Sequence, residues 1–507
     1  MPQPLSEEVL RQTFTDAGQG HVFTYFDSLT AEGKAKLLKQ LDTIDVNRVN
    51  RIFAKATTAP PHDKDTVDPL PAEAFNSTLG PEMSTSVVDW REAGLKLIAE
   101  GKVAVLVLAG GQGTRLGSSA PKGCYDIGLP SHKSLFQLQA ERILSIQRVA
   151  VQKYPQLKGK ATVPWYVMTS EPTRAATEAF FKEHAYFGLE AKNVVFFNQG
   201  VLPAFTMDGK ILMEDKGVVA TAPDGNGGIY KALRREGVLA DFERRGTLYV
   251  HAYSVDNCLV KVADPVFIGY CVSKNVKSGV KVVPKLRASE PVGVICLRDK
   301  KFAVVEYSEI PESLSNQVNA DGKTLTYNAA NICNHFYTTD FLNSVEEMED
   351  SLEFHVAKKK IKHIDLKTGE IVVPTSSNGI KLELFIFDVL PFVEKLAVLE
   401  MARKEEFSPL KNAPGSKDGD SPDTCRADIL AQHKRYIEAA GGSVSGEVEL
   451  SGLVSYSGEG LEGLKGVALQ GPRVVDTVGS TALRPVSVLD GLNGRFKAMK
   501  GWLASCF

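Results

Sequence analysis

The chain of 507 residues carries a formal net charge of −2, because 59 Lys and Arg nearly balance 61 Asp and Glu. Hydrophobic residues make up 43% and charged residues 24%, the composition of an ordinary globular protein long enough for two or three domains. This balance excludes a bulk electrostatic attraction to nucleic acid or to a membrane surface, so any anion-binding site must be local.

The N-terminus and the cysteines predict a cytoplasmic protein. The opening stretch, MPQPLSEEVL, lacks the basic segment and apolar run of a secretory signal. No apolar run approaches the ~20 residues that cross a membrane as a helix. The seven cysteines are scattered and contain no C-x-x-C, which favours reduced thiols over a disulfide framework or a zinc site.

Residues 1–101 predict a helical N-terminal region. Helices are expected between residues 5 and 55, with Ser6 as the cap of SEEVLRQTF and Thr30 as the cap of TAEGKAKLLKQL. A polar, Pro-rich stretch at 57–73 separates them from a further helical segment at 84–100.

From Lys102 onward, short β-rich runs alternate with helical patterns. Strands are expected at 103–109, 162–170, 193–197, 247–255 and 292–297, and helices at 134–154 and 227–246. Such alternation predicts an α/β fold with a largely parallel sheet that helices cover on both faces.

The C-terminal part begins with a polar loop at 413–424 and continues into a Gly- and Val-rich region in which we expect short β elements. The predicted domains are the helical region 1–101, a catalytic domain at 102–390 and a C-terminal domain at 391–507.

A glycine-rich loop follows the strand expected at 103–109, since four of the eight positions 110–117 are glycine. A Walker A loop is excluded because no Gly-Lys-Ser/Thr completes the motif. A dinucleotide fingerprint is excluded because Gly111, Gly113 and Gly117 are spaced one residue too widely. Paired glycines can turn backbone N–H groups toward phosphate, and Arg115 and Lys122 can neutralise its oxygens. The alternative is a simple strand-to-helix turn with solvent-facing cations.

LAGGQGTRLGSSAPKG, at 108–123, resembles the signature of the UDP-sugar pyrophosphorylases, the UDPGP type 1 family. The continuation CYDIGLPSHKSLFQLQAERI is similar to the branch of that family that uses N-acetylhexosamine. Further similar blocks run in order along roughly residues 84–460: TAPDGNGGIY, YSVDNCLVKVADP, EPVGVIC, VVEYSEI, NICNHF, NGIKLELFIFD and EEFSPLKNA. The resemblance implies a Rossmann-like nucleotidyltransferase fold with a mixed, mainly parallel sheet and a small β-rich C-terminal part.

The reaction implied by the resemblance joins UTP to N-acetylglucosamine 1-phosphate, giving UDP-N-acetylglucosamine and diphosphate, with GalNAc 1-phosphate as a further substrate. A phosphate oxygen of the sugar attacks the α-phosphorus of UTP in line, and this nucleophile is already ionised near neutral pH because its second pKa is ~6. The obstacle is repulsion between two polyanions, so the site must supply cations and positioning.

The resemblance assigns the reaction and the triphosphate to residues from distant parts of the chain. Arg115, Lys122 and Lys411 are the expected catalytic cations. UTP contacts are expected at Leu108, Ala109, Gly110, Gly111, Lys122, Gln199, Gly225, Asp256 and Lys381.

Lys381 opens the strand expected over KLELFIF. Alternation would place it on one face with Glu383, Phe385 and Phe387, a mixture that suits a ligand wall. The alternative is a lysine that snorkels at the start of a strand.

Asp256 follows the strand expected at 247–255, where ligands gather in open α/β sheets. Its carboxylate is the expected ligand of Mg²⁺, with Mn²⁺ as an alternative metal. Otherwise Asp256 would be a helix cap or a turn former.

The base and sugar sites are also assigned by the resemblance. Sugar-phosphate contacts are expected at Asn226, Gly293, Glu306, Tyr307, Asn331, Phe385, Phe387 and Lys411. The loop PDGNGG is expected to supply backbone groups to uracil; the alternative, compatible with that role, is a turn in which Asp224 or Asn226 caps the next helix.

Two positions depart from the family pattern, and two alternative functions remain. Ala330 stands where glycine is common and Cys124 where methionine is common, and the tail after residue 466 resembles the family poorly. The alternatives are a UDP-glucose or broad UDP-sugar pyrophosphorylase, and a nucleotide-sugar-binding regulator without turnover. The expected partners are the two small substrates, without nucleic acid or membrane, on a monomer or homodimer.

Overall fold

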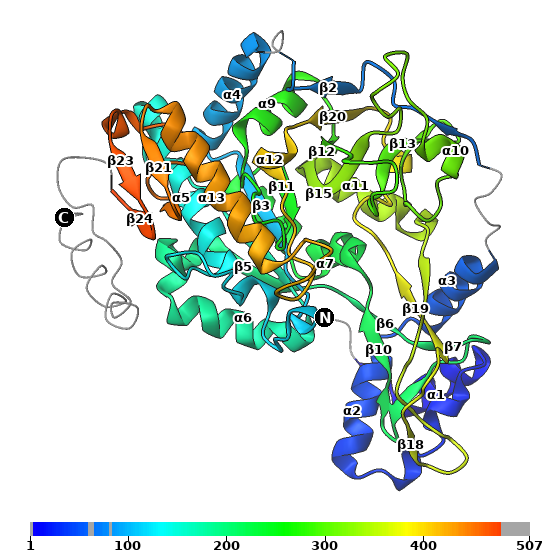
Figure 1. Ribbon diagram of the computed structural model, residues 1–507. Helices are drawn as coiled ribbons and strands as arrows, with labels where there is room; N and C mark the ends of the chain where they lie inside the picture. Colours follow the sequence, from blue (N-terminus) through cyan, green and yellow to red (C-terminus); the bar gives the residue numbers. More distant parts are fainter. Residues whose placement is uncertain (1–3, 59–64, 81–83, 478–507) are drawn as a thin grey trace.

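The computed structural model describes residues 4–58, 65–80 and 84–477, and it builds them around one large twisted sheet (Figure 1). The strands of this sheet are β1 (Val67–Asp68), β2 (Phe75–Ser77), β3 (Val103–Leu108), β4 (Trp165–Thr169), β5 (Val194–Asn198), β11 (Tyr249–Ser254), β12 (Ser278–Pro284), β13 (Val294–Arg298), β14 (Lys301–Val305), β15 (Ala329–Thr338) and β20 (Leu396–Glu400).

The sheet is mixed and mainly parallel, as the sequence predicted. Its order is β2-β20-β12-β15-β11-β3-β4-β5, with β13 attached at β15 and pairing in turn with β1 and β14. Along the main path only β15 runs antiparallel to its neighbours β11 and β12. The parallel strands β3, β4 and β11 therefore end at one common edge, which is where ligands gather in folds of this kind.

Helices cover both faces of the sheet. Alternate residues of each strand point to opposite faces, and the apolar side chains on each face pack against their own set of helices. Val105 of β3 belongs to a core with α4, α5 and α9, whereas Leu106 belongs to a core with α7, α8 and α11. The helices are α1 (Glu7–Asp16), α2 (Ala31–Asp42), α3 (Val46–Thr58), α4 (Ser84–Ala99), α5 (Leu135–Lys153), α6 (Glu171–Glu183), α7 (Ile229–Arg235), α8 (Val238–Arg245), α9 (Pro265–Ser273), α10 (Glu312–Ser315), α11 (Thr339–Met348), α12 (Arg403–Glu406) and α13 (Pro422–Ala439).

The N-terminal helices pack on an arm of short strands, away from the C-terminal strands (Figure 1). Ser6 and Thr30 cap α1 and α2 as predicted, since their side chains accept hydrogen bonds from Val9 N and Gly33 N. The arm contains β6 (Val201–Pro203), β7 (Phe205–Thr206), β8 (Met213–Asp215), β9 (Val218–Val219), β10 (Thr221–Pro223), β16 (His355–Lys359), β17 (His363–Ile364), β18 (Ile371–Val372) and β19 (Gly379–Glu383).

Three elements differ from the sequence-based expectations. The helix expected at 227–246 is two helices, because Gly237 adopts a left-handed φ of 73° between α7 and α8. The strand expected over residues 381–387 ends at Glu383, so strand alternation does not govern Phe385 and Phe387. The C-terminal part holds short strands as expected, but the 18-residue helix α13, capped by Ser421, precedes them.

The short C-terminal strands are β21 (Ser443–Ser445), β22 (Val448–Leu450), β23 (Ala468–Gln470) and β24 (Arg473–Val475). The end of the divergent tail lies outside the described residues, as do Cys506 and part of the Pro-rich stretch. The six cysteines within the described ranges are all free thiols. None of the described helices has both the length and the apolar character needed to cross a membrane. The domain boundaries at 101/102 and 390/391 stay predictions.

Candidate functional site

The glycine-rich loop leaves the buried end of β3 and opens to solvent at Gly111. Leu108 and Ala109 are buried, whereas Gly111 is exposed, and a side chain there would meet nothing within 4 Å. Gly110 packs against Gln199, because a Cβ at this glycine would lie 2.7 Å from Gln199 Oε1. The loop therefore has open space over its backbone, as a phosphate-binding loop requires.

Two of the predicted triphosphate residues meet at the end of this loop. Lys122 Nζ lies 3.5 Å from Asp256 Oδ2 and donates a hydrogen bond to the Leu410 carbonyl oxygen at 3.2 Å. Lys411, which follows Leu410 in the chain, has a half-exposed side chain whose Nζ lies 3.5 Å from Asp420 Oδ2. Arg115 lies exposed in the short turn Thr114–Leu116 and has no carboxylate partner within the described ranges.

The segment after β11 is joined to the segment after α12 by a set of hydrogen bonds centred on Asn257. Asn257 Nδ2 donates to the Glu406 carbonyl oxygen at 2.7 Å, and its Oδ1 accepts from Ser408 N at 3.1 Å. Leu410 N donates to the Asp256 carbonyl oxygen at 2.9 Å. We call residues 256–258 and 406–410 the seam. The seam brings the main chain of Leu410, the residue before Lys411, against Lys122 and Asp256, although the two segments are far apart in the chain.

A buried cluster of charges supports the seam from within. The fully buried Lys281 Nζ lies 2.6 Å from Asp264 Oδ2 and 3.0 Å from Glu406 Oε2, and Lys261 Nζ lies 3.4 Å from Glu406 Oε1. Burial opposes ionisation of Asp264, but the charges of Lys281 and Lys261 outweigh it and lower the pKa of this carboxyl. Each charge is paired, which is the condition for keeping charges in a protein interior.

The loop PDGNGG lies against residues 384–386 through main-chain hydrogen bonds. Leu384 N donates to the Asp224 carbonyl oxygen at 2.8 Å, and Gly227 N donates to the Leu384 carbonyl oxygen at 2.8 Å. Gly225 has a φ of 87°, and a Cβ there would lie 2.1 Å from the Leu384 oxygen. Only glycine fits this position.

Neither polar side chain of this loop caps the following helix, so the alternative of a capping turn is wrong. Asn226 Oδ1 instead accepts a hydrogen bond from Ile386 N at 2.9 Å. The carboxyl of Asp224 is buried beside Gly200 and Gly228, where any Cβ would clash with it. Burial raises the pKa of Asp224 to about 6.

The predicted sugar-binding residues gather around Gly293. A Cβ at Gly293 would lie 2.9 Å from Glu306 Oε1, and Asn331 N donates to the Gly293 carbonyl oxygen at 2.9 Å. Burial and the nearby charge of Glu309 raise the pKa of Glu306, whereas His355 and Lys411 act in the opposite direction. The charge of Lys411, the lysine predicted to hold the sugar phosphate, therefore acts on the half-buried carboxyl of Glu306.

Four further predicted residues differ in their exposure and in their contacts. Tyr307 is 54% exposed, whereas Phe387 is buried in the core and contacts Phe385 with ring centroids 5.2 Å apart. Phe385, half buried, is thus the more accessible of the two rings. Lys381 lies on β19 opposite Ala357 and forms no ion pair with any described residue.

The departures from the family pattern both lie in packed surroundings. The Ala330 methyl is fully buried with Val283 and Ile332 in the sheet, so it packs as core. Half-buried Cys124 packs against the core cluster, and burial raises its pKa to about 12.

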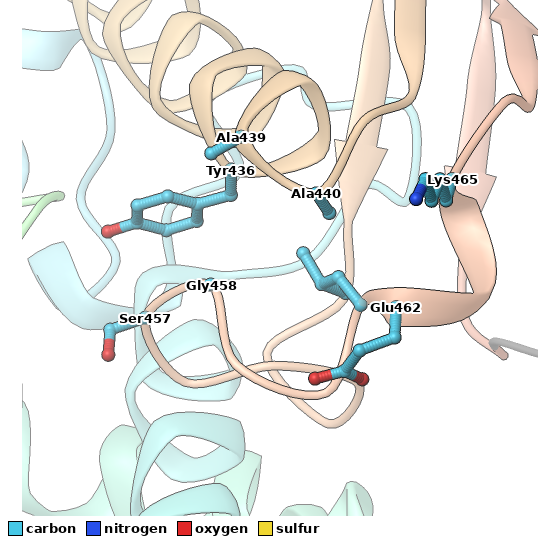
Figure 2. Close-up of a pocket in the computed structure, with 8 residues that line it drawn as sticks. Tyr436, Ala439, Ala440, Ser457, Gly458, Glu462 and Lys465 are labelled. Atoms are coloured by element: carbon cyan, nitrogen blue, oxygen red, sulfur yellow. The ribbon is translucent and has the colours of Figure 1, made fainter.

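A cavity of about 490 Å³ lies in the C-terminal part, between the end of α13 and the turn at 457–465 (Figure 2). Its walls include Tyr436, Ser457, Glu462 and Lys465, and no predicted site residue lines it. No group of three or more His, Cys, Asp or Glu that could hold a metal ion occurs within the described ranges.

Comparisons with known proteins agree with the motifs. Residues 47–441 match the family model described as UTP–glucose-1-phosphate uridylyltransferase. UDP-N-acetylglucosamine pyrophosphorylase of Saccharomyces cerevisiae is 45% identical, covering 90% of this chain and 97% of the relative. UDP-N-acetylhexosamine pyrophosphorylase-like protein 1 of Xenopus tropicalis is 46% identical, covering 90% and 94%. The crystal structure of the Trypanosoma brucei UDP-N-acetylglucosamine pyrophosphorylase in complex with inhibitor matches at a TM-score of 0.79 and 31% identity, covering 91% of this chain and 95% of that chain.

Replacement of Lys281 by methionine should destabilise the protein by about 3–5 kcal/mol, because Asp264 would lose its buried cation. Urea unfolding should show a lower midpoint, and Lys277→Met, an exposed neighbour, serves as the control. Equal midpoints for the two variants would contradict the role of the cluster.

Asp224→Asn should stabilise the protein above pH 7 by up to about 3 kcal/mol. Because burial raises the pKa of Asp224 in the folded protein to about 6 from its ordinary value of 3.8, ionisation destabilises the wild type at neutral pH. Protonation removes that cost as the pH falls through 6 toward 4. The difference in urea midpoint between variant and wild type should therefore be about three times larger at pH 7.5 than at pH 4.5, because about 1 kcal/mol of the cost remains until the pH falls below 3.8. A pH-independent difference would show that charge is not the cause.

Proposed function

This chain belongs to the UTP–glucose-1-phosphate uridylyltransferase family, and we propose that its site transfers the uridylyl group of UTP to N-acetylglucosamine 1-phosphate. The products are UDP-N-acetylglucosamine and diphosphate, and the chain is a nucleotidyltransferase. The observation that supports the proposal is the seam, in which the main chain of Leu410, the residue before Lys411, bonds both Lys122 and Asp256 near the open glycine loop.

The reaction needs little covalent chemistry from the protein. The sugar phosphate is already a nucleophile, and the attacking oxygen must approach the α-phosphorus opposite the departing diphosphate. Lys122 and Arg115 would neutralise the triphosphate from the glycine loop, and Lys411 would hold the sugar phosphate from the other side of the seam. Cations fixed in this way reduce the repulsion between the two anions before they react.

Base and sugar would bind on either side of residues 384–386. Gly225 and Gln199 would contact uracil, and Leu108 to Gly111 would contact the nucleotide. Lys381, which has no ion pair within the described ranges, is available for a phosphate. The sugar would be recognised by Glu306 and Asn331, because carboxylate and amide groups can accept or donate hydrogen bonds at its hydroxyls. Phe385 would pack against its apolar parts.

Asp256 would hold Mg²⁺, or Mn²⁺ in its place, together with phosphate oxygens. Its carboxylate is partly exposed and is held by a cation, Lys122, that can turn to phosphate instead. When bound, the metal would supply positive charge to the triphosphate. The compartment and the choice between monomer and homodimer stay predictions.

The preferred sugar is tested by measuring diphosphate release from UTP with four acceptors: the 1-phosphates of GlcNAc, GalNAc, glucose and galactose. We expect the highest kcat/KM with GlcNAc 1-phosphate, and loss of activity in EDTA that Mg²⁺ restores. A preference for glucose 1-phosphate would favour the broader UDP-sugar enzyme. Binding of UDP-sugar without any turnover would favour the regulator.

Lys122→Ala and Lys411→Ala should each lower kcat at least about 100-fold, because a fixed cation that stabilises developing charge is typically worth that much. Lys182→Ala, an exposed lysine on α6, is the matched control and should leave kcat unchanged. Melting temperatures close to that of the wild type would show that the fold is intact. Near-normal kcat in both site variants would contradict the roles assigned to these lysines.

A further inference from the structure

His355 lies at the start of β16, among the residues expected to surround the sugar, although no motif pointed to it. Its ring contacts that of Phe385 with centroids 4.4 Å apart, and its Nε2 lies 3.0 Å from Asp388 Oδ1. About a third of its side chain is exposed. Nδ1 has no hydrogen-bond partner within the described ranges, so this nitrogen is available to a ligand.

Asp388 holds His355 and Phe385 together. While Oδ1 lies at hydrogen-bond distance from the imidazole, Oδ2 accepts a hydrogen bond from Phe385 N at 2.6 Å. One buried carboxylate thus fixes both the backbone of Phe385 and the ring that packs on it. The pair has a defined position before any ligand arrives.

The charges that face His355 favour its protonated form. Burial lowers its pKa, but the hydrogen bond and charge of Asp388, with the charges of Glu309 and Glu306, outweigh burial and raise it. Glu383 lies opposite His355 in the strand register. Two more charged groups act on these partners. Glu353 contributes to raising the pKa of Asp388, and Lys411 acts to lower the pKa of Glu306.

We propose that His355 is a further substrate-binding residue, which holds the Phe385 wall of the sugar subsite and binds the sugar 1-phosphate through its free ring nitrogen. This inference rests on the proposed function. The sugar is the favoured partner because Glu306 and Phe385 both lie on the sugar side, whereas Asn226 and Gly227 occupy the backbone groups of residues 384 and 386. A cationic donor suits an anionic or hydroxyl-bearing ligand, since charge-assisted hydrogen bonds are the stronger ones.

His355→Gln and His355→Asn separate the two parts of the role. Glutamine keeps a donor toward Asp388 but removes the second nitrogen and the charge, whereas asparagine keeps a polar atom near Nδ1 and loses the contact with Asp388. We expect His355→Gln to raise KM for GlcNAc 1-phosphate about tenfold, the loss of one charge-assisted hydrogen bond. KM for UTP should change less than twofold, and melting temperatures should show whether each variant is folded.

The pH profile supplies a readout that a purely structural role would not change. Because a raised pKa means that the charge is present below it and lost above it, wild-type KM for the sugar phosphate should rise as the pH increases through the His355 pKa. This rise should be absent in His355→Gln. The ionisation of the substrate phosphate is the same for both proteins and cancels in the comparison.

Binding of GlcNAc 1-phosphate and of UTP, measured by calorimetry, separates this inference from the proposed function. Weaker sugar-phosphate binding by a folded His355→Gln, with UTP binding unchanged, supports the assignment whatever the turnover. A wild-type enzyme that turns over while His355→Gln keeps the same sugar KM and the same pH profile overturns this inference alone. Equal losses for both substrates also overturn it. A wild type that binds UTP but not GlcNAc 1-phosphate overturns both proposals.

Discussion

The candidate site depends on one buried amide. Asn257 joins the segment that carries Asp256 to the segment that carries Lys411, by donating to one main-chain group and accepting from another. Beneath it, Lys281 pairs with two carboxylates, so the joined segments rest on a cluster in which each charge has a partner. A site that must hold two anions together needs fixed cations, and a rigid main-chain junction fixes them better than long flexible side chains alone.

The same construction recurs at the base and sugar sites. The loop around Gly225 is joined to Leu384 by two main-chain hydrogen bonds, and the absence of a side chain at Gly225 allows this close approach. Asp388 continues the arrangement by holding Phe385 from its backbone nitrogen. The nucleotide loop and the sugar wall therefore share one short stretch of chain, so a displacement of the loop would also displace the wall.

Local patterns predicted the main sheet, the first helices and the glycine loop, because strand alternation, capping residues and glycine spacing act over a few residues. The seam could not be predicted this way, since Asn257 and Ser408 meet only in the folded chain. The buried carboxyl of Asp224 and the position of His355 were missed for the same reason. Phe387 shows the opposite error: an alternation that looked continuous ended at Glu383, and the ring lies in the core.

The position of β20 in the large sheet has a consequence for the synthesis of the protein. β20 lies between β2, near the start of the chain, and β12, so it fills a gap that two earlier strands leave open. While the ribosome is still translating the residues before Leu396, β12 has no outer neighbour and exposes its backbone groups. Pairings this distant in sequence form slowly, and open strand edges invite association with other chains. The outer edge of β12 therefore gains its partner only after Leu396–Glu400 has been synthesised.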